Sequence, residues 1–379
     1  MKVAIVSPWA ISEESIGGTE RFIIDLASIL HDIGETVEVF MLSGKSRTIN
    51  SVKYISLDIL GQGKAADEYA LRRLAYGSKN EDFYEMWARR LENAVDISEF
   101  DVIQINSLLF INAWPNKPRI FTIHTNPFEY ALDWGDSRLE QVVHKVRAGS
   151  LNKTVFTTPS EHYGSYFSKA LNQNVRVIPH AIELSRLAKI AVRKHTKSAA
   201  QEAAVTILLP SRLEPVQKRP QIVFEGVALL PKRERERIQI IASGADTHYR
   251  DNYISLESIA ANNGFKARFM TFRTMAEAYY LADIVALPSK SESFGYAALE
   301  SLSLGIPTIL NSLPTYREIG ADNANAHFFD ETAESFSRAL LKLLRGDIQK
   351  RSHVSQSWLK RYDMRLWAKK YQTLAKDIS

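Results

Sequence analysis

Hydrophobic and polar positions follow two alternating patterns along this chain. Short runs of apolar, often β-branched residues recur, and segments with apolar residues three or four positions apart follow many of them. In residues 19–33 the apolar side chains fall on one side of a helix, and Gly34 ends that pattern. Repeated pairs of strand and helix predict an α/β fold, with parallel sheets wrapped by helices.

The expected strands form two sets. The first set is 2–7, 36–42, 101–105, 119–124 and 155–159, and the second is 205–211, 238–243, 267–272, 284–287, 308–311 and 326–328. Helical segments such as 220–230 and 332–344 follow strands of the second set, whereas 61–99 is polar and helical with no strand of its own. Two such arrays predict two Rossmann-like, doubly wound domains that face each other across a cleft.

The domain boundaries follow from a change in composition. Residues 184–204 are rich in Lys, Arg, Ala and Ser, which is typical of a junction. We therefore predict an N-terminal domain over 1–184, a C-terminal domain over 205–355 and a helical segment over 356–379. We expect that last segment to pack back on the N-terminal domain.

Length and composition agree with two domains and exclude several classes of protein. A chain of 379 residues, 45% hydrophobic and 24% charged, is typical of a globular protein. No apolar stretch is long enough for a membrane span, and the first residues resemble a buried strand rather than a signal peptide. With no cysteine, disulfides and thiolate metal sites are excluded, which favours a cytoplasmic location.

The net charge of +5 is unevenly distributed. Residues 1–185 carry a net −4 and the remainder a net +9. A basic C-terminal half fits an anionic ligand such as a nucleoside diphosphate, and it also fits nucleic acid or merely a solvated face. The acidic first half opposes docking on an anionic membrane. A local patch with Arg72, Arg73, Arg89 and Arg90 would favour such docking, so peripheral membrane contact is the less favoured alternative.

Four features carry the candidate chemistry. Gly17 and Gly18 precede the 19–33 helix, where backbone amides approach a phosphate, although a plain structural turn has the same residues. Arg212 and Lys218 lie in a loop directly after a strand and suit phosphate oxygens, as would any solvated loop. His124 ends a strand, where a purely structural histidine is also common.

The fourth feature is a pair of glutamates after the strand 284–287. Glu292 lies in a loop that opens a helix near Gly295, and the amides around Phe294 and Tyr296 point out of that helix start. Glu300 lies inside an otherwise apolar helix, where an unpaired carboxylate is costly. Surface charge alone also explains such pairs.

In this order and spacing, these features resemble the retaining glycosyltransferases of family 4, or glycosyl transferases group 1, which have the GT-B fold. The flanking segments 175–179, 281–285 and 300–307 resemble the family as well. The likeness covers nearly the whole chain, is strongest from 205 to 320 and weakest from 43 to 99.

The resemblance implies residue roles. Arg212 and Lys218 would neutralise the departing diphosphate, and His124 would lie beside the sugar ring. Glu300 would bind the ribose and Glu292 the transferred sugar. The rest of the donor site would comprise Gly17, Gly18, Ser293, Phe294, Gly295 and Tyr296. The family needs no metal ion and no cofactor, because basic side chains and helix dipoles stabilise the leaving group.

Three positions depart from the family pattern. Arg219 follows Lys218 where glycine is usual, and Ser293 stands where glycine is common before the Phe-Gly pair. Residues 180–183 replace the usual Asn-Gly-Val-Asp type of turn. None of these departures removes a charged donor contact.

The sequence thus predicts an enzyme, a hexosyltransferase that moves a sugar from a UDP- or GDP-sugar to a glycan, lipid-linked or small-molecule hydroxyl. Phe128, Tyr130 and Trp134 are candidates to contact the acceptor, and a satellite hydrophobic cluster accounts for them equally well. Alternatives are a catalytically silent nucleotide-sugar-binding partner subunit and an epimerase of the same fold, although the first domain lacks the carboxylate cluster an epimerase needs. A nucleic-acid partner is not expected, because aromatic and basic residues do not interleave.

Overall fold

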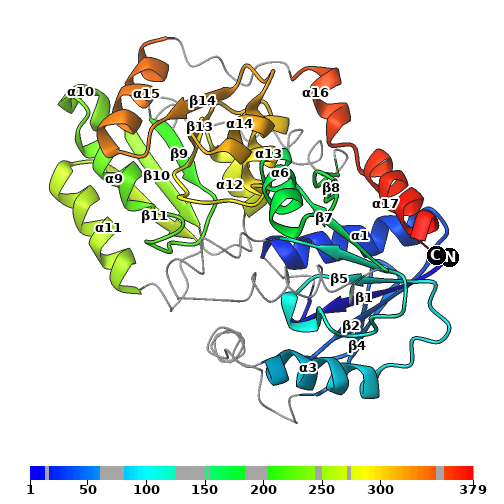
Figure 1. Ribbon diagram of the computed structural model, residues 1–379. Coiled ribbons are helices and arrows are strands. Elements are labelled where there is room, and N and C mark those ends of the chain that lie inside the picture. The colour runs from blue at the N-terminus through cyan, green and yellow to red at the C-terminus, as the bar shows by residue number, and fades with distance from the viewer. Residues whose placement is uncertain are drawn as a thin grey trace. The chain divides into compact units, whose positions relative to one another are not determined.

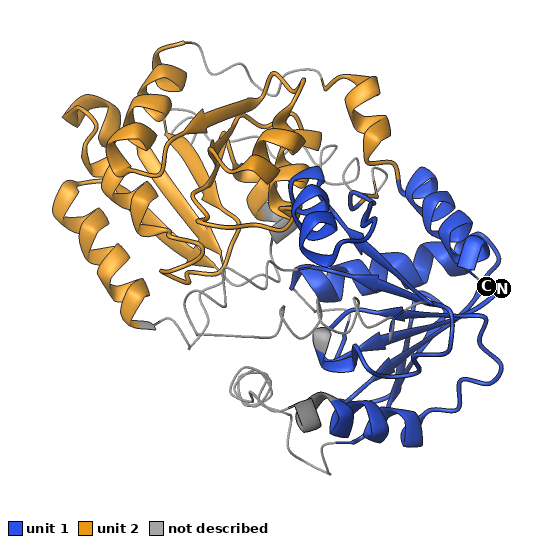
Figure 2. Cartoon of the chain, viewed as in Figure 1, with its two compact units in different colours: residues 1–180, 364–379 blue, residues 181–363 orange. Residues whose placement is uncertain are grey.

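The computed structural model describes residues 1–12, 17–59, 81–124, 151, 153–183, 204–243, 250–270, 275–346 and 354–378. The chain forms two compact units, shown in Figure 2. Unit 1 comprises Met1–His180 and Met364–Ser379, and unit 2 comprises Ala181–Asp363. The chain therefore passes from one unit to the other twice, after His180 and after Asp363.

Unit 1 is built on an eight-stranded sheet with the order β3-β4-β2-β1-β5-β6-β7-β8 (Figure 1). Its strands are β1 (Lys2–Ser7), β2 (Thr36–Met41), β3 (Arg47–Ile49), β4 (Val52–Ser56), β5 (Val102–Ile105), β6 (Arg119–Thr122), β7 (Thr154–Thr158) and β8 (Arg176–Val177). All neighbours pair in parallel except β3 and β4, which form an antiparallel hairpin. Central strands such as β5 are buried along their length, as parallel strands between helices are.

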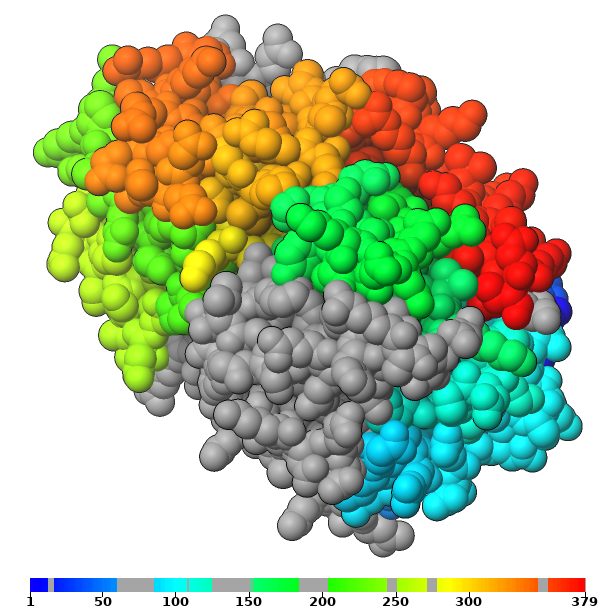
Figure 3. All heavy atoms as spheres, viewed as in Figure 1, coloured from blue at the N-terminus to red at the C-terminus, as the bar shows by residue number. Residues whose placement is uncertain are grey.

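The described helices of unit 1 are α1 (Gly18–Asp32), α3 (Glu81–Ala94), the 3-10 turn η1 (Leu108–Phe110), α6 (Glu161–Leu171) and α17 (Met364–Ile378). The C-terminal helix α17 packs on α1. The ring of Phe22 lies 5.6 Å from that of Trp367 and 5.9 Å from that of Tyr371. The outer surface of α17, red in Figure 3, exposes Arg365, Lys369, Lys370 and Lys376.

Unit 2 is built on a six-stranded, fully parallel sheet with the order β11-β10-β9-β12-β13-β14. Its strands are β9 (Val205–Leu209), β10 (Ile238–Ser243), β11 (Lys266–Met270), β12 (Ile284–Leu287), β13 (Thr308–Asn311) and β14 (Ala326–Phe329). Its described helices are α9 (Gln221–Ala228), α10 (Lys232–Arg235), α11 (Arg250–Asn263), α12 (Met275–Leu281), α13 (Tyr296–Ser303), α14 (Pro314–Gly320), α15 (Ala333–Arg345) and α16 (Gln356–Arg361). The helix α16 stays with unit 2 because Trp358 is fully buried and donates from Nε1 to the carbonyl of Ile319 at 2.9 Å.

The predicted fold class, two α/β domains with parallel sheets, is confirmed. Most strands lie where the hydrophobic runs predict them, but the hairpin β3–β4 was not expected. The first unit ends at His180 where 184 was predicted, and the segment 356–379 is divided between the units, since α16 stays with unit 2 and α17 joins unit 1. That the two domains face each other across a cleft stays a prediction. None of the helices in the described ranges has the length and apolarity to cross a bilayer.

Candidate functional site

The loops that carry the two main motifs of unit 2 lie side by side. Strands β9 and β12 are parallel neighbours, with Ile207 opposite Ile284, so their carboxyl ends meet at the same edge of the sheet. The loop after β9 carries Lys218 and the loop after β12 carries Glu292. A backbone hydrogen bond of 2.7 Å from Lys290 to the Gln217 carbonyl joins them. Ligands of parallel α/β sheets bind at such strand ends.

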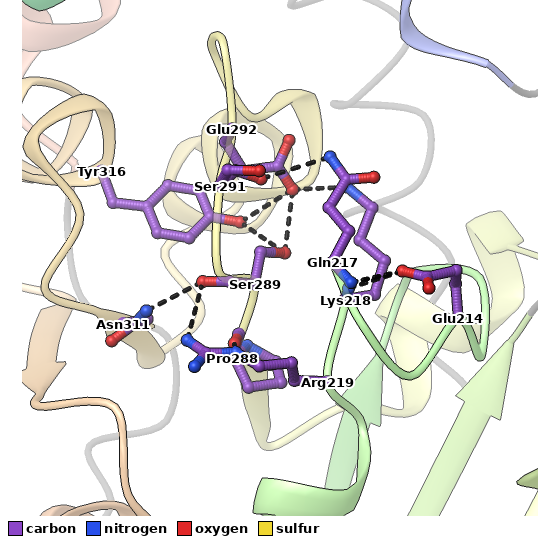
Figure 4. Close-up of polar contacts among 10 residues, drawn as sticks. All are labelled: Glu214, Gln217, Lys218, Arg219, Pro288, Ser289, Ser291, Glu292, Asn311 and Tyr316. Atoms are coloured by element: carbon purple, nitrogen blue, oxygen red, sulfur yellow. Dashed lines mark hydrogen bonds and ion pairs between the residues drawn. The ribbon is translucent and has the colours of Figure 1, made fainter. Parts of the chain in front are cut away.

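Glu292 is the centre of a polar cluster drawn in Figure 4. Its Oε1 accepts hydrogen bonds from Lys218 Nζ at 2.5 Å, from Ser289 Oγ at 2.9 Å and from Tyr316 OH at 3.3 Å. The side chains of Lys218 and Glu292 are each 15% exposed. Among the described residues, none donates to the second oxygen, Oε2. The carboxylate is thus held by one oxygen, and its other oxygen is able to accept further hydrogen bonds.

Glu214 shapes the loop that presents Lys218. Its carboxylate accepts the backbone amides of Val216 at 2.9 Å, Gln217 at 2.5 Å and Lys218 at 3.2 Å. A carboxylate that gathers consecutive amides fixes a tight turn, because these donors would otherwise need water. The turn points the ammonium group of Lys218 toward Glu292 (Figure 4).

Arg219, the first departure from the family pattern, closes the same loop. Its backbone has φ +48°, a left-handed conformation that glycine adopts without strain, which explains why glycine is usual there. Its guanidinium donates to the carbonyls of Pro288 at 3.2 Å and Ser289 at 3.4 Å, and lies 3.8 Å from Glu331 Oε2. Burial lowers the pKa of Arg219, and Glu331 partly offsets that effect. The side chain therefore ties the two loops together.

Arg212 lies at the start of this loop and is half-buried. Within the part of the chain that the structure describes, its guanidinium makes no hydrogen bond or ion pair. A guanidinium with five unused donors, in a loop at the carboxyl end of a parallel strand, suits an oxyanion.

The helix α13 begins at a glycine that cannot be replaced without strain. Gly295 is the N-cap, with φ +107°. A Cβ on Gly295 would lie 2.6 Å from Cε1 of Tyr316, a separation that real atoms do not adopt. The ring of Tyr316 therefore packs against the backbone of this helix start. Phe294, directly before this glycine, is buried. Ser293, the second departure from the family pattern, does not have a positive φ, so the position does not require glycine.

The second glutamate, Glu300, lies one turn or more inside α13 and is also held by a tyrosine. Tyr279 of α12 donates from its hydroxyl to Glu300 Oε2 at 3.0 Å and to the carbonyl of Ala297 at 3.4 Å. Burial, then the charge of Glu300, raises the pKa of Tyr279 well above its ordinary value, so the phenol stays a donor. Glu300 is thereby satisfied in an apolar helix, as the sequence requires.

In unit 1, His124 lies at the end of β6 and is buried rather than open. Its Nε2 lies 3.1 Å from Asn106 Oδ1, and its ring packs edge-on against Phe22 at 4.5 Å and lies 5.7 Å from His180. Burial lowers its pKa to about 3, and the pKa of His180 is also well below its ordinary value. Both rings are therefore neutral near pH 7.

The glycine pair starts the helix α1 as predicted. Gly17 is the N-cap, with φ −74° and ψ 152°, an extended conformation that any residue adopts. A side chain at Gly17 would collide with the carboxylate of Glu20, which folds back over it. The Glu20 carboxylate is the far end of a flexible side chain that can move aside, so neither space nor φ makes glycine obligatory at this position. The acceptor candidates Phe128, Tyr130 and Trp134 lie outside the described residues.

Three residues of the site were missed by sequence reasoning: Ser289, Tyr316 and Tyr279. Ser289 is the second residue after the end of β12, three positions before Glu292. The two tyrosines lie 24 and 21 residues from their glutamates, on other helices, and nothing local marks them. In the described ranges, no three side chains of His, Asp or Glu gather as metal ligands would.

Comparisons with known proteins identify the family of this chain. The family model of glycosyltransferase family 4 matches residues 16–186, and that of glycosyl transferases group 1 matches residues 192–360. The chain is 30% identical over 161 residues to a D-inositol 3-phosphate glycosyltransferase of Geodermatophilus obscurus, which covers 39% of this chain and 34% of that protein. It is 20% identical over 377 residues to a phosphatidyl-myo-inositol mannosyltransferase of Mycolicibacterium smegmatis, with 94% and 88% covered.

Solved structures show the same fold at low sequence identity. Sucrose-phosphate synthase from Thermosynechococcus elongatus has a TM-score of 0.74 at 15% identity, and covers 100% of this chain and 98% of that one. The Anabaena HepE protein in complex with UDP and glucose has a TM-score of 0.68 at 15% identity, with 99% of both chains covered. The alignment to the D-inositol 3-phosphate enzyme spans about a third of that relative's length. Together the two family models account for nearly the whole chain, which belongs to glycosyltransferase family 4 and has its GT-B architecture of two Rossmann-like domains.

Proposed function

We propose that this chain is a retaining, metal-independent glycosyltransferase that uses a UDP- or GDP-sugar. The observation that carries the proposal is the Lys218–Glu292 pair, held at 2.5 Å and only partly exposed, with Glu292 in the loop that leads into α13. Arg212, in the same loop as Lys218, has no partner among the described residues. Charges at a strand end that are neither fully buried nor fully solvated are suited to a charged ligand that displaces water. HepE, a structural neighbour, was solved in complex with UDP and glucose, which supports a nucleotide-sugar donor.

In the proposed reaction, the bond between C1 of the sugar and the phosphate oxygen breaks. A bond from the acceptor oxygen to C1 forms on the same face, and the acceptor proton passes to the departing diphosphate. Arg212 and Lys218 neutralise the charge that develops on the diphosphate, which strengthens their contacts in the transition state. Glu292 binds a hydroxyl of the transferred sugar through Oε2, and Glu300 binds the ribose.

The acceptor is a hydroxyl compound, either a glycan, a lipid-linked glycan or a small metabolite. Two relatives are named for inositol-based acceptors, which makes inositol derivatives the first compounds to assay. We propose that the enzyme acts in the cytoplasm, where nucleotide sugars are available, without a bound cofactor.

The first experiment identifies the donor. A thermal-shift screen of UDP- and GDP-sugars should raise the melting temperature with one of them, because a ligand that binds the native state stabilises it by mass action. The same donor is then assayed with acceptors in excess chelator. A lack of any shift, or turnover that returns only with magnesium or manganese, would count against the proposal.

The second experiment separates the two glutamates by calorimetric titration with the nucleoside diphosphate. Glu300→Ala should weaken its binding, because the ribose is part of this ligand. Glu292→Gln should leave its binding unchanged and lower turnover, because the ligand lacks the sugar. Equal losses of affinity in both variants would show that the two roles are wrongly assigned.

A further inference from the structure

Each glutamate of the pair is hydrogen-bonded by a buried tyrosine from another helix. Tyr316, on α14, donates to Glu292, and Tyr279, on α12, donates to Glu300. Tyr316 is 1% exposed and Tyr279 is 2% exposed, so neither hydroxyl is placed to touch a ligand itself. The two tyrosines hold different carboxylates, since Tyr316 is hydrogen-bonded to Glu292 and Tyr279 to Glu300.

The geometry around Tyr316 selects one orientation of Glu292. Its hydroxyl lies 3.3 Å from Glu292 Oε1 and 3.4 Å from Ser289 Oγ, and Ser289 donates to the same Oε1 (Figure 4). With Lys218 also on Oε1, three donors converge on one oxygen and leave Oε2 directed elsewhere. The ring of Tyr316 lies against Gly295, so the tyrosine also fixes where the α13 helix start lies relative to this carboxylate.

Tyr279, on α12, restricts the orientation of Glu300 in a similar way. Its hydroxyl donates to Glu300 Oε2 at 3.0 Å and lies 3.4 Å from the carbonyl of Ala297, on the preceding turn of α13. A phenol that bridges a carboxylate and a backbone carbonyl of the same helix restricts the rotamers of that glutamate, and a carboxylate with fewer rotamers loses less entropy on binding.

We infer that Tyr316 and Tyr279 are positioning residues with different targets, Tyr316 for the glutamate that contacts the transferred sugar and Tyr279 for the glutamate that contacts the ribose. The inference rests on the proposed function, because it takes these two contacts from it. Neither tyrosine is a catalytic residue, since each acts through its glutamate.

The charge state of the tyrosines agrees with this role. Burial first, and the neighbouring carboxylate second, raises the pKa of both phenols well above the ordinary value. Both therefore remain neutral donors at any working pH and add no charge to the donor site.

The test is a matched pair of variants, Tyr316→Phe and Tyr279→Phe, each of which removes one oxygen and keeps the ring. Tyr316→Phe should lower kcat roughly tenfold, the order seen when an outer hydrogen-bond partner of a functional group is lost. Its affinity for UDP or GDP, measured by calorimetry, should not change. Tyr279→Phe should weaken that affinity and raise KM several-fold, with little change in kcat.

Tyr362→Phe is the control. Tyr362 is also buried in unit 2, its ring lies 5.0 Å from that of Trp358, and its hydroxyl has no hydrogen bond to a described residue. Its loss should change neither kcat nor affinity. Melting temperatures of all three variants show whether each has folded. If Tyr316→Phe does not fold, Ser289→Ala removes another donor to the same Oε1 and should give the same fall in kcat.

A fall in kcat only for Tyr316→Phe and a fall in affinity only for Tyr279→Phe would distinguish positioning of the two glutamates from general support of the fold. A loss of kcat and affinity together in both tyrosine variants, or wild-type values in both, overturns the inference. If Glu292→Gln and Glu300→Ala also leave turnover and UDP or GDP affinity unchanged, the proposed function itself is wrong. If the glutamate variants show their effects and the tyrosine variants do not, only the positioning role is wrong.

Discussion

The strand ends of the two units differ in chemistry although both come from parallel sheets. In unit 1, His124 lies near the end of its strand as a neutral, buried ring, hydrogen-bonded to Asn106 and packed against Phe22. In unit 2 the corresponding side chains are charged and partly exposed, with Lys218 and Glu292 paired between two joined loops and Arg212 at the start of one of them. Parallel sheets therefore end in a packed, neutral edge at His124 and in a charged, partly exposed edge at Lys218 and Glu292. We expect most of the donor affinity to come from unit 2.

Removal of the charges of unit 2 gives the largest expected effect. Lys218→Ala and Arg212→Ala should each lower turnover on the order of 10²-fold, as the loss of one oxyanion-type donor does. Arg212→Ala should leave the melting temperature unchanged, since that side chain has no partner within the described residues. If either variant keeps full turnover with the cognate donor, that side chain does not stabilise the leaving group.

The second largest expected effect is a loss of stability at Gly295, the N-cap of α13. Gly295→Ala forces a methyl group against the Tyr316 ring at a position with φ +107°, and should cost about 1–3 kcal/mol of unfolding free energy from overpacking alone. Gly264→Ala is the control, because Gly264 has φ +73° and open space around it. Denaturant titration of both variants separates the ring contact from backbone strain; equal losses would mean that the contact contributes nothing.

His124 should make the stability of unit 1 depend on pH. The folded-state pKa of His124 is about 3, below the value near 6.5 of an unfolded histidine. The stability that depends on this neutral ring is complete above pH 6.5 and falls as the pH drops toward 3. The expected slope is about 1.4 kcal/mol per pH unit. His124→Asn should flatten the profile between pH 6.5 and 4.5 by this amount, as measured by urea unfolding; an unchanged slope would show that His124 is not buried as a neutral ring.

The smallest expected effect concerns Arg219. Arg219→Ala loses the contacts to Pro288 and Ser289 and keeps the left-handed backbone, whereas Arg219→Gly loses the same contacts and relieves the strain. Glycine should therefore be more stable than alanine by about 1 kcal/mol. Thermal unfolding of the two variants measures the difference, and an alanine variant as stable as the glycine variant would contradict the strain argument.

The sequence predicted most of the fold because buried parallel strands are continuous apolar runs. Strands β1, β10 and β12 lie where those runs predict them. The hairpin β3–β4 gives no such signal. Its two-residue turn, Asn50–Ser51, has φ of 48° and 66°, conformations that are normally marked by glycine.

The candidate site was predictable only in part for a similar reason. Loops at neighbouring strand ends were expected to meet, and Lys218 and Glu292 do so. Their partners Tyr316 and Tyr279 come from helices whose side chains reach the site through tertiary packing, and the local sequence of a helix does not specify what its buried face contacts. The division of 356–379 between the units depends on Trp358 and Trp367, two tryptophans that are indistinguishable by composition.

The path of the chain has a consequence for synthesis. Since unit 2 is made of one continuous segment, it can fold while the ribosome is still adding residues, whereas unit 1 lacks α17 until its last segment emerges. Until then Phe22 faces water where Trp367 and Tyr371 will later pack. A nascent chain halted after Asp363 should therefore show a protease-resistant unit 2 and a protease-sensitive unit 1, and protection of both would contradict this order of folding.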